Sequence, residues 1–254
     1  MRLHAGHLNM AARFSACMLA AGPHSLLMPL PLTLALSSRF GREERLKRLH
    51  RMVAWARFCR RHLLGIDLSV TGRQRLPRPS RGHMYVANHQ SYVDILVLME
   101  ALDTVAFLSK APVKYIPFIG QCAYAGGTVF IQRRNGDSRQ HALRETLRMC
   151  QQSTAVVIFP EGTRSTTNEL RPRIHPGAIR AARDSGLKIV PVGLFGTTDV
   201  VPKTMDRVNT GQRVAVSIGR ALDPAAYPDA DGWVDAVWGA VAKHHARCRR
   251  QVAG

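Results

Sequence analysis

The chain has 254 residues, of which 46% are hydrophobic, and it carries a formal net charge of +19 at pH 7. This length fits one large domain, or one domain with an appendage, and the charge indicates anionic partners: nucleic acid, a phospholipid surface or a phosphorylated substrate. The five cysteines include no C-x-x-C spacing, which argues against a disulfide framework or a cysteine zinc site and suits a reducing compartment.

The excess charge is concentrated at the front of the chain, where residues 1–83 hold 15 Lys and Arg against 3 Asp and Glu. Residues 14–36 contain no Lys, Arg, Asp or Glu and are nearly long enough to span a bilayer. Pro23, Pro29 and Pro31 interrupt this stretch. We therefore favour broken helices that enter one leaflet over a full span, a signal peptide, or a buried or disordered leader.

Residues 42–64 have the periodicity of a basic amphipathic helix that Gly65 ends. Arg and Lys fill much of the space between its apolar positions, so we interpret the helix as lying on an anionic membrane surface. One alternative is a surface helix packed on its own domain; another is a nucleic-acid contact, for which no recognition motif is present. The apolar positions are Leu46, Leu49, Val53, Ala56 and Leu63.

After Gly65, short β-type runs alternate with helical stretches. This alternation predicts an α/β domain over residues 66–254, with a mixed, largely parallel sheet flanked by helices. Residues 1–65 then form a separate N-terminal apolar and amphipathic helical segment for membrane association. The predicted strands are 66–71, 83–87, 104–109, 127–131, 155–159, 188–194 and 213–218, and the predicted helices are 91–102, 138–152, 176–185 and about 230–250.

The stretch NHQSYVD follows one of these strands and opens a helix. His89 and Asp94 lie five positions apart, but His62 and Asp67 share this spacing, so context has to distinguish the two pairs. Ser91 and Asp94 fit a helix N-cap with its acidic partner. Asp94 can also accept a hydrogen bond from His89, which makes the pair a candidate general base with its orienting acid.

Two further stretches place polar groups at strand ends. In FPEGTRS an apolar strand runs into a proline, and Gly162 permits a tight turn. The polar side chains expected to project from it are Glu161, Thr163, Arg164 and Ser165. In GGTVFIQRR the strand ends near Arg133 and Arg134, and an arginine at a strand end suits a phosphate, which its guanidinium binds through two hydrogen bonds. The plain alternatives are a charged surface turn for the first stretch and a solvated strand terminus for the second.

No dinucleotide-binding, Walker, esterase-elbow or H-E-x-x-H motif is present. Instead NHQSYVD, GGTVFIQR, FPEGTRS and IVPVGL occur in this order. Together, over about residues 84–220, they resemble the four blocks of the glycerolipid acyltransferase family, the lysophosphatidic acid acyltransferases. SKAPVKYIPFIGQ is also similar to the K…IPxxG segment of that family.

The resemblance implies a role for each matching residue. His89 would be the general base and Asp94 its partner, and Pro191 would help to shape the acyl site. Backbone N–H groups around Gly162 are candidate donors to the oxyanion. A thioester is already activated, so no covalent nucleophile, metal or other cofactor is implied. The residues that would bind the phosphate and glycerol of the acceptor are Arg133, Glu161, Gly162, Thr163 and Arg164.

These observations favour a membrane-associated acyltransferase at the cytoplasmic face of the inner (plasma) membrane, with no nucleic-acid partner. Its donor would be acyl-CoA or acyl carrier protein, and its acceptor a lysolipid, most directly 1-acyl-sn-glycerol-3-phosphate, which gives phosphatidic acid.

Three departures leave lyso-ornithine lipid or another lysolipid as an alternative acceptor. Gln132 replaces a frequent Asp, K-A-P-V replaces K-x-E-L, and His175 stands near a usual basic pair. A non-catalytic basic protein that binds anionic lipid or nucleic acid is the alternative of another class, but it would have no need for His89 and Asp94.

Overall fold

The computed structural model describes residues 42–77, 82–115, 123–124, 128–132, 136–152 and 154–254. Within these ranges seven strands form one sheet in the order β1-β7-β6-β2-β5-β3-β4. Neighbouring strands are parallel except β6 and β7, so the predicted mixed, largely parallel sheet is confirmed. The strands are β1 (Asp67–Thr71), β2 (His83–Ala87), β3 (Ala106–Lys110), β4 (Val129–Ile131), β5 (Val156–Ile158), β6 (Lys188–Phe195) and β7 (Arg213–Ile218).

Every predicted strand is present, and its first and last residues lie within two positions of the prediction. For the predicted helices after Gly65, the first and last residues lie within three positions of the prediction. The helix predicted over 42–64 is α3, which continues into a π-helical turn, η2. The short helix α8 was not predicted. The helices are α3 (Arg42–Phe58), η2 (Cys59–Leu63), α4 (Val93–Leu102), α6 (Gly136–Gln152), α7 (Gly177–Asp184), α8 (Thr197–Val200) and α9 (Ala230–Ala253), with short 3-10 turns η3 (Arg73–Arg75), η4 (Ala111–Tyr115) and η5 (Pro224–Ala226).

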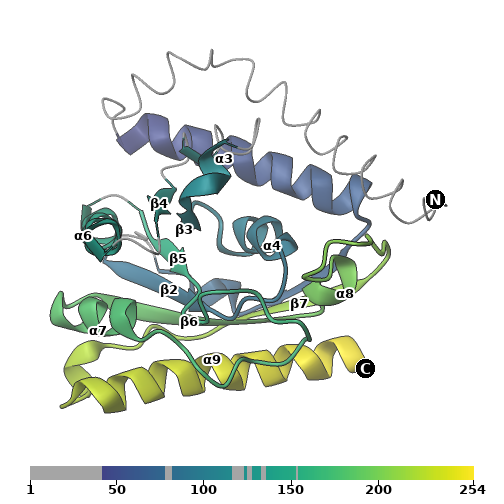
Figure 1. Ribbon diagram of the computed structural model, residues 1–254. Coiled ribbons are helices and arrows are strands. Elements are labelled where there is room, and N and C mark those ends of the chain that lie inside the picture. The colour runs from purple at the N-terminus through teal and green to yellow at the C-terminus, as the bar shows by residue number, and fades with distance from the viewer. Residues whose placement is uncertain (1–41, 78–81, 116–122, 125–127, 133–135, 153) are drawn as a thin grey trace.

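Helices cover both faces of the sheet (Figure 1). Alternate residues of β2 enter different cores: Tyr85 and Ala87 join a cluster with α3 and α4, whereas Met84 and Val86 join one with α6, α7 and α9. A strand buried on both faces needs apolar side chains at successive positions. This requirement explains why β2 reads as the continuous run MYVA rather than as an alternating pattern.

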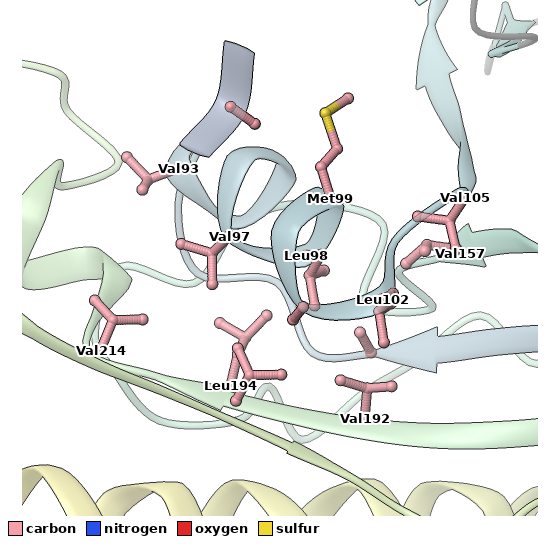
Figure 2. Close-up of a cluster of buried hydrophobic side chains, with 14 of the residues drawn as sticks. Val93, Val97, Leu98, Met99, Leu102, Val105, Val157, Val192, Leu194 and Val214 are labelled. Atoms are coloured by element: carbon pink, nitrogen blue, oxygen red, sulfur yellow. The ribbon is translucent and has the colours of Figure 1, made fainter. Parts of the chain in front are cut away.

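Packing against the sheet fixes the position of α4. Figure 2 shows Val97, Leu98 and Leu102 of α4 pointing toward Val192 and Leu194 of β6, and all five are buried. Each buried side chain of this size contributes about 1.5–3 kcal/mol. The helix is therefore held with its first turn, which contains Asp94, beside the end of β2.

Helix α3 lies over α4 (Figure 1). Its residues Val53 and Ala56 belong to the same core as α4, and Leu49 is also buried. Arg60 binds Glu100 of α4 through two hydrogen bonds of 2.6 and 3.1 Å. One face of the helix thus belongs to the folded domain, which is the packing alternative given by the sequence. A membrane contact by its basic outer face stays a prediction.

No helix in the described ranges is both long enough and apolar enough to cross a bilayer. The apolar stretch 14–36 lies outside the described residues, and so does most of the predicted membrane segment 1–65.

Candidate active site

The predicted pair forms at the carboxyl end of β2. His89 lies in the connection from β2 to α4, and Asp94 lies in the first turn of α4. The Nδ1 atom of His89 is 2.7 Å from Oδ2 of Asp94; the imidazole is 18% exposed and the carboxylate 0%. A carboxylate only accepts hydrogen bonds, so Nδ1 carries the hydrogen of this contact and Nε2 keeps a lone pair for a substrate proton.

Backbone amides also hold the Asp94 carboxylate. Its Oδ2 atom accepts the N–H groups of Gln90 (2.7 Å) and Ser91 (3.0 Å), and Ser91 Oγ accepts the N–H of Val93 (3.3 Å). Tyr92 directly precedes α4 and has no side-chain cap of its own, so the cap predicted at Ser91 is not at the residue before the helix, but Ser91 and Asp94 both accept backbone N–H groups at the helix start. The same carboxylate serves the start of the helix and the imidazole, as the sequence suggested.

The turn FPEGTRS lies directly against His89. Strands β2 and β5 are parallel neighbours, so their carboxyl ends meet at one edge of the sheet. The Phe159 ring stacks on the His89 ring, with centroids 4.2 Å apart and planes at 17°, and the Ser165 amide donates to the His89 carbonyl (2.8 Å). Gly162 has φ +67°, which explains the glycine in the turn. The Gly162 amide donates to the Phe159 carbonyl, so an oxyanion donor has to come from another group.

Glu161 joins the two stretches from inside the protein. Its side chain is 3% exposed, and Oε1 accepts the His89 amide (3.0 Å). Burial raises the pKa of Glu161 from 4.5 to about 7. The His89 N–H opposes this rise, the charge of Asp94 adds to it, and the charge and backbone N–H of Arg171 oppose it. The second oxygen, Oε2, is buried without a hydrogen-bond partner. A buried acceptor of this kind is costly unless something, such as a substrate hydroxyl, donates to it.

Glu161 should make the stability of the fold depend on pH. Its folded pKa of about 7 lies above the ordinary 4.5, so the folded chain holds a proton that the unfolded chain loses across this interval. The free energy of unfolding should then fall as the pH rises from about 4.5 to 7, by at most about 3 kcal/mol. Glu161→Gln, which can still accept the His89 amide, should remove the fall in urea titrations at pH 5 to 8.

The exposed carboxylate of Asp235 provides the control, because Asp235→Asn should keep the wild-type pH dependence. A Glu161→Gln protein with the same pH dependence as the wild type would show that Glu161 is not its source.

Arg164 is oriented by an aromatic ring that the sequence did not single out. Its guanidinium carbon lies 3.7 Å from the centroid of the Tyr92 ring, and its Nη1 atom is buried without a partner. Tyr92 is 50% exposed although it is large and apolar. Stacking on an aromatic face is a favourable arrangement for an arginine that binds an anion. Thr163 precedes Arg164 in the turn and is partly buried.

Other predicted residues lie apart from this cluster or outside the described residues. Arg133 falls outside them, and Gln132 before it is exposed at the end of β4, two strands away from β5. Pro191 is buried within β6, paired with Val86 of β2. His62 is exposed, and its ring contacts Phe58.

Two residues that sequence reasoning missed support the pair. Asn88 is buried and exchanges two hydrogen bonds with the backbone of Leu194, of 3.0 and 2.9 Å, which ties the end of β2 to β6. Thr197, the first residue of α8, donates its hydroxyl to Oδ1 of Asp94. Asn88 belongs to a conspicuous motif and could have been found, whereas Thr197 follows β6 with no local signal.

Within the described ranges, no three His, Cys, Asp or Glu side chains gather as a metal site.

The known proteins that this chain resembles are acyltransferases. A family model described as Acyltransferase matches residues 67–194, half of the chain. A 1-acyl-sn-glycerol-3-phosphate acyltransferase from Chlamydomonas reinhardtii is 30% identical over 235 residues, which cover 91% of this chain and 69% of that protein. A lyso-ornithine lipid O-acyltransferase from Pseudomonas aeruginosa is 36% identical over 156 residues, which cover 60% of this chain and 56% of that protein.

The fold also matches a solved structure. The 1-acyl-sn-glycerophosphate (LPA) acyltransferase PlsC from Thermotoga maritima has a TM-score of 0.74, and the match covers 94% of this chain and 98% of that one. The sequence identity is 23%, so this likeness shows a shared fold. Some matched proteins are longer: the chain spans 44% of a chloroplastic 1-acyl-sn-glycerol-3-phosphate acyltransferase from Brassica napus.

Proposed function

The chain belongs to the Acyltransferase family, and on that premise we propose that it transfers a fatty acyl group from an acyl thioester to the free hydroxyl of a lysolipid. The acceptor we propose first is 1-acyl-sn-glycerol-3-phosphate, which would give phosphatidic acid; this is the substrate named for the Chlamydomonas relative. The observation that carries the proposal is the hydrogen bond between His89 and the buried Asp94 at the edge of the sheet.

In the proposed reaction, Nε2 of His89 takes the proton of the acceptor hydroxyl as that oxygen attacks the thioester carbonyl carbon. The new C–O bond forms, the C–S bond breaks, and the imidazolium returns the proton to the departing thiolate. Asp94 fixes the tautomer of His89 and stabilises its charged form. Phe159 stacks on the imidazole and limits its rotation.

The acceptor headgroup would contact the FPEGTRS turn. Arg164 has a guanidinium nitrogen without a partner, which supports a role in phosphate binding, and Glu161 has a free carboxyl oxygen that suits a glycerol hydroxyl. Gly162 and Thr163 complete the turn between them, and we propose Arg133 as a second phosphate ligand. In this arrangement one turn packed against His89 holds an arginine nitrogen and a carboxyl oxygen without partners, which suits a phosphorylated alcohol.

Lyso-ornithine lipid is the second candidate acceptor, because the relative named for it is 36% identical over the 156 residues that match. An acyl-transfer assay on the purified protein, with product masses measured, would separate the candidates. The acceptors should include 1-acyl-sn-glycerol-3-phosphate, lyso-ornithine lipid and a lysophospholipid, each tested with acyl-CoA and with acyl carrier protein. A folded protein that acylates none of them with either donor would contradict the proposed function.

We further propose that residues 1–65, whose helix α3 also packs into the core of the domain predicted over 66–254, hold the protein on the cytoplasmic face of the inner membrane. Because α3 packs into the core of the domain, the test should remove only residues 1–41 and start the chain at Arg42. The truncated protein is expected to move from the membrane fraction to the soluble fraction. The membranes should be washed with high salt, because salt screens charge and releases protein that is held only by its surface charge. A truncated protein that sediments with washed membranes would contradict this role for the first 41 residues.

A further inference from the structure

The two oxygens of the Asp94 carboxylate are held from different parts of the chain. Oδ2 accepts His89 Nδ1 and the backbone amides of Gln90 and Ser91, all from the connection between β2 and α4. Oδ1 accepts the hydroxyl of Thr197, 103 positions later in the sequence. Asp94 and Thr197 are both 0% exposed, so no bulk water competes for this contact.

The backbone around Thr197 is closely constrained. Strand β6 ends at Phe195, Gly196 turns the chain with φ +96°, and α8 begins at Thr197. A Cβ atom at Gly196 would lie 2.4 Å from the carbonyl oxygen of Arg213, so the turn has little freedom to move. The hydrogen bonds between Asn88 and Leu194 lock the end of β6 to the end of β2. The hydroxyl of Thr197 is therefore presented to Asp94 from a fixed position.

We propose that Thr197 is a positioning residue for acyl transfer, which acts by holding the plane of the Asp94 carboxylate. A carboxylate held through one oxygen can rotate about that oxygen and carry its lone pairs away from the imidazole. A donor on the other oxygen prevents this rotation, so Oδ2 stays in line with Nδ1 of His89 and Nε2 stays directed at the acceptor hydroxyl. This inference rests on the proposed function of the His89 pair.

Asp94 is the partner that the geometry favours for this hydroxyl. The Oγ1 atom of Thr197 is also 3.5 Å from Oε1 of Gln90, which is the outer limit of a hydrogen bond. The Gln90 amide nitrogen is already engaged with the Asn168 carbonyl. The structural contribution of Thr197 to α8 comes from its backbone carbonyl, which accepts the Val201 amide and is retained when the side chain changes.

Two substitutions separate the hydroxyl from the shape of the side chain. Thr197→Val keeps the shape without the hydroxyl and should lower kcat about 10-fold, equivalent to about 1.4 kcal/mol, with KM for both substrates within about two-fold. Thr197→Ser keeps the hydroxyl and should stay within about three-fold of wild-type kcat. Thr198→Val is the matched control, because Thr198 makes contacts of only 3.4 and 3.5 Å and should be near wild type.

A double substitution distinguishes positioning from a general loss of structure. In the Asp94→Asn background, Thr197→Val should lower kcat less than two-fold further, because both changes act through the same contact. If the double variant instead loses kcat by the product of the two single losses, the inference is wrong. A folded Thr197→Val enzyme with wild-type kcat would also overturn it. So would a Thr197→Ser enzyme as slow as Thr197→Val. If Thr197→Val does not fold by circular dichroism, Thr197→Ala replaces it with the same expected results. An active, folded His89→Ala enzyme would instead contradict the proposed function itself.

Discussion

His89→Ala should lower the rate of acyl transfer by about 10²–10⁴-fold, which is the usual contribution of a general base. The imidazole is held by Asp94 on one side and by stacking on Phe159 on another, so the alanine variant loses a group that is already in position. The measurement is kcat under saturating donor and acceptor. Circular dichroism and thermal melts on the same samples would separate lost chemistry from lost fold.

The chain supplies its own control in His62, which has the same spacing to Asp67 as His89 has to Asp94. Both His62 and Asp67 are exposed, and the His62 ring lies against Phe58. His62→Ala should leave turnover within a few-fold of wild type once membrane binding is matched. A folded His89→Ala enzyme with nearly full activity, or an equal loss in both variants, would rule out the proposed mechanism.

Arg164→Ala should raise KM for a phosphate-bearing acceptor about 10- to 100-fold and leave KM for the acyl donor nearly unchanged. The expected loss of about 1.5–3 kcal/mol is that of one charge-assisted hydrogen bond. Tyr92 allows a graded version of the test: Tyr92→Phe keeps the stacking surface under the guanidinium, whereas Tyr92→Ala removes it. We expect the phenylalanine variant to resemble the wild type and the alanine variant to share part of the Arg164→Ala defect.

Arg180 provides the control for this series, because it forms an exposed ion pair with Asp231 on α9. Arg180→Ala should change neither KM. If Arg164→Ala weakens both substrates equally, the residue contributes to the fold or to the chemical step rather than to phosphate binding. The same comparison with lyso-ornithine lipid as acceptor would show how far the effect depends on a phosphate.

The parts of the site that the sequence predicted are the local ones. His89, Ser91 and Asp94 lie within six residues of one another, so a strand followed by a helix start is enough to bring them together. The hydrogen bond from the His89 amide to Glu161 is different, because it joins segments 72 positions apart. Spacing along the chain contains no information about which strands become neighbours, and only the family resemblance placed these two stretches in one site.

The helix α3 shows that a sequence pattern can predict a buried face without predicting what covers it. Its apolar positions Leu49, Val53 and Ala56 define one buried face, but the hydrophobic effect has no direction and favours any apolar surface that covers them. The sequence pattern therefore fits a membrane and a protein core equally well. The structure places this face on α4, and the ion pair of Arg60 with Glu100 is consistent with a permanent contact.

The central position of β2, between β5 and β6, has a consequence for how the enzyme becomes active. His89 and Asp94 are close in the sequence and are synthesised early. The residues that hold this region in place, Glu161, Leu194 and Thr197, lie 72 to 106 positions after the residues they contact. Contacts of such long sequence separation form only after the entropy of closing large loops has been overcome, so they tend to form late in folding. A ribosome-bound chain that has exposed only the first half of the protein would carry the motif without its geometry. Activity should therefore appear in one cooperative step, when the three central strands join.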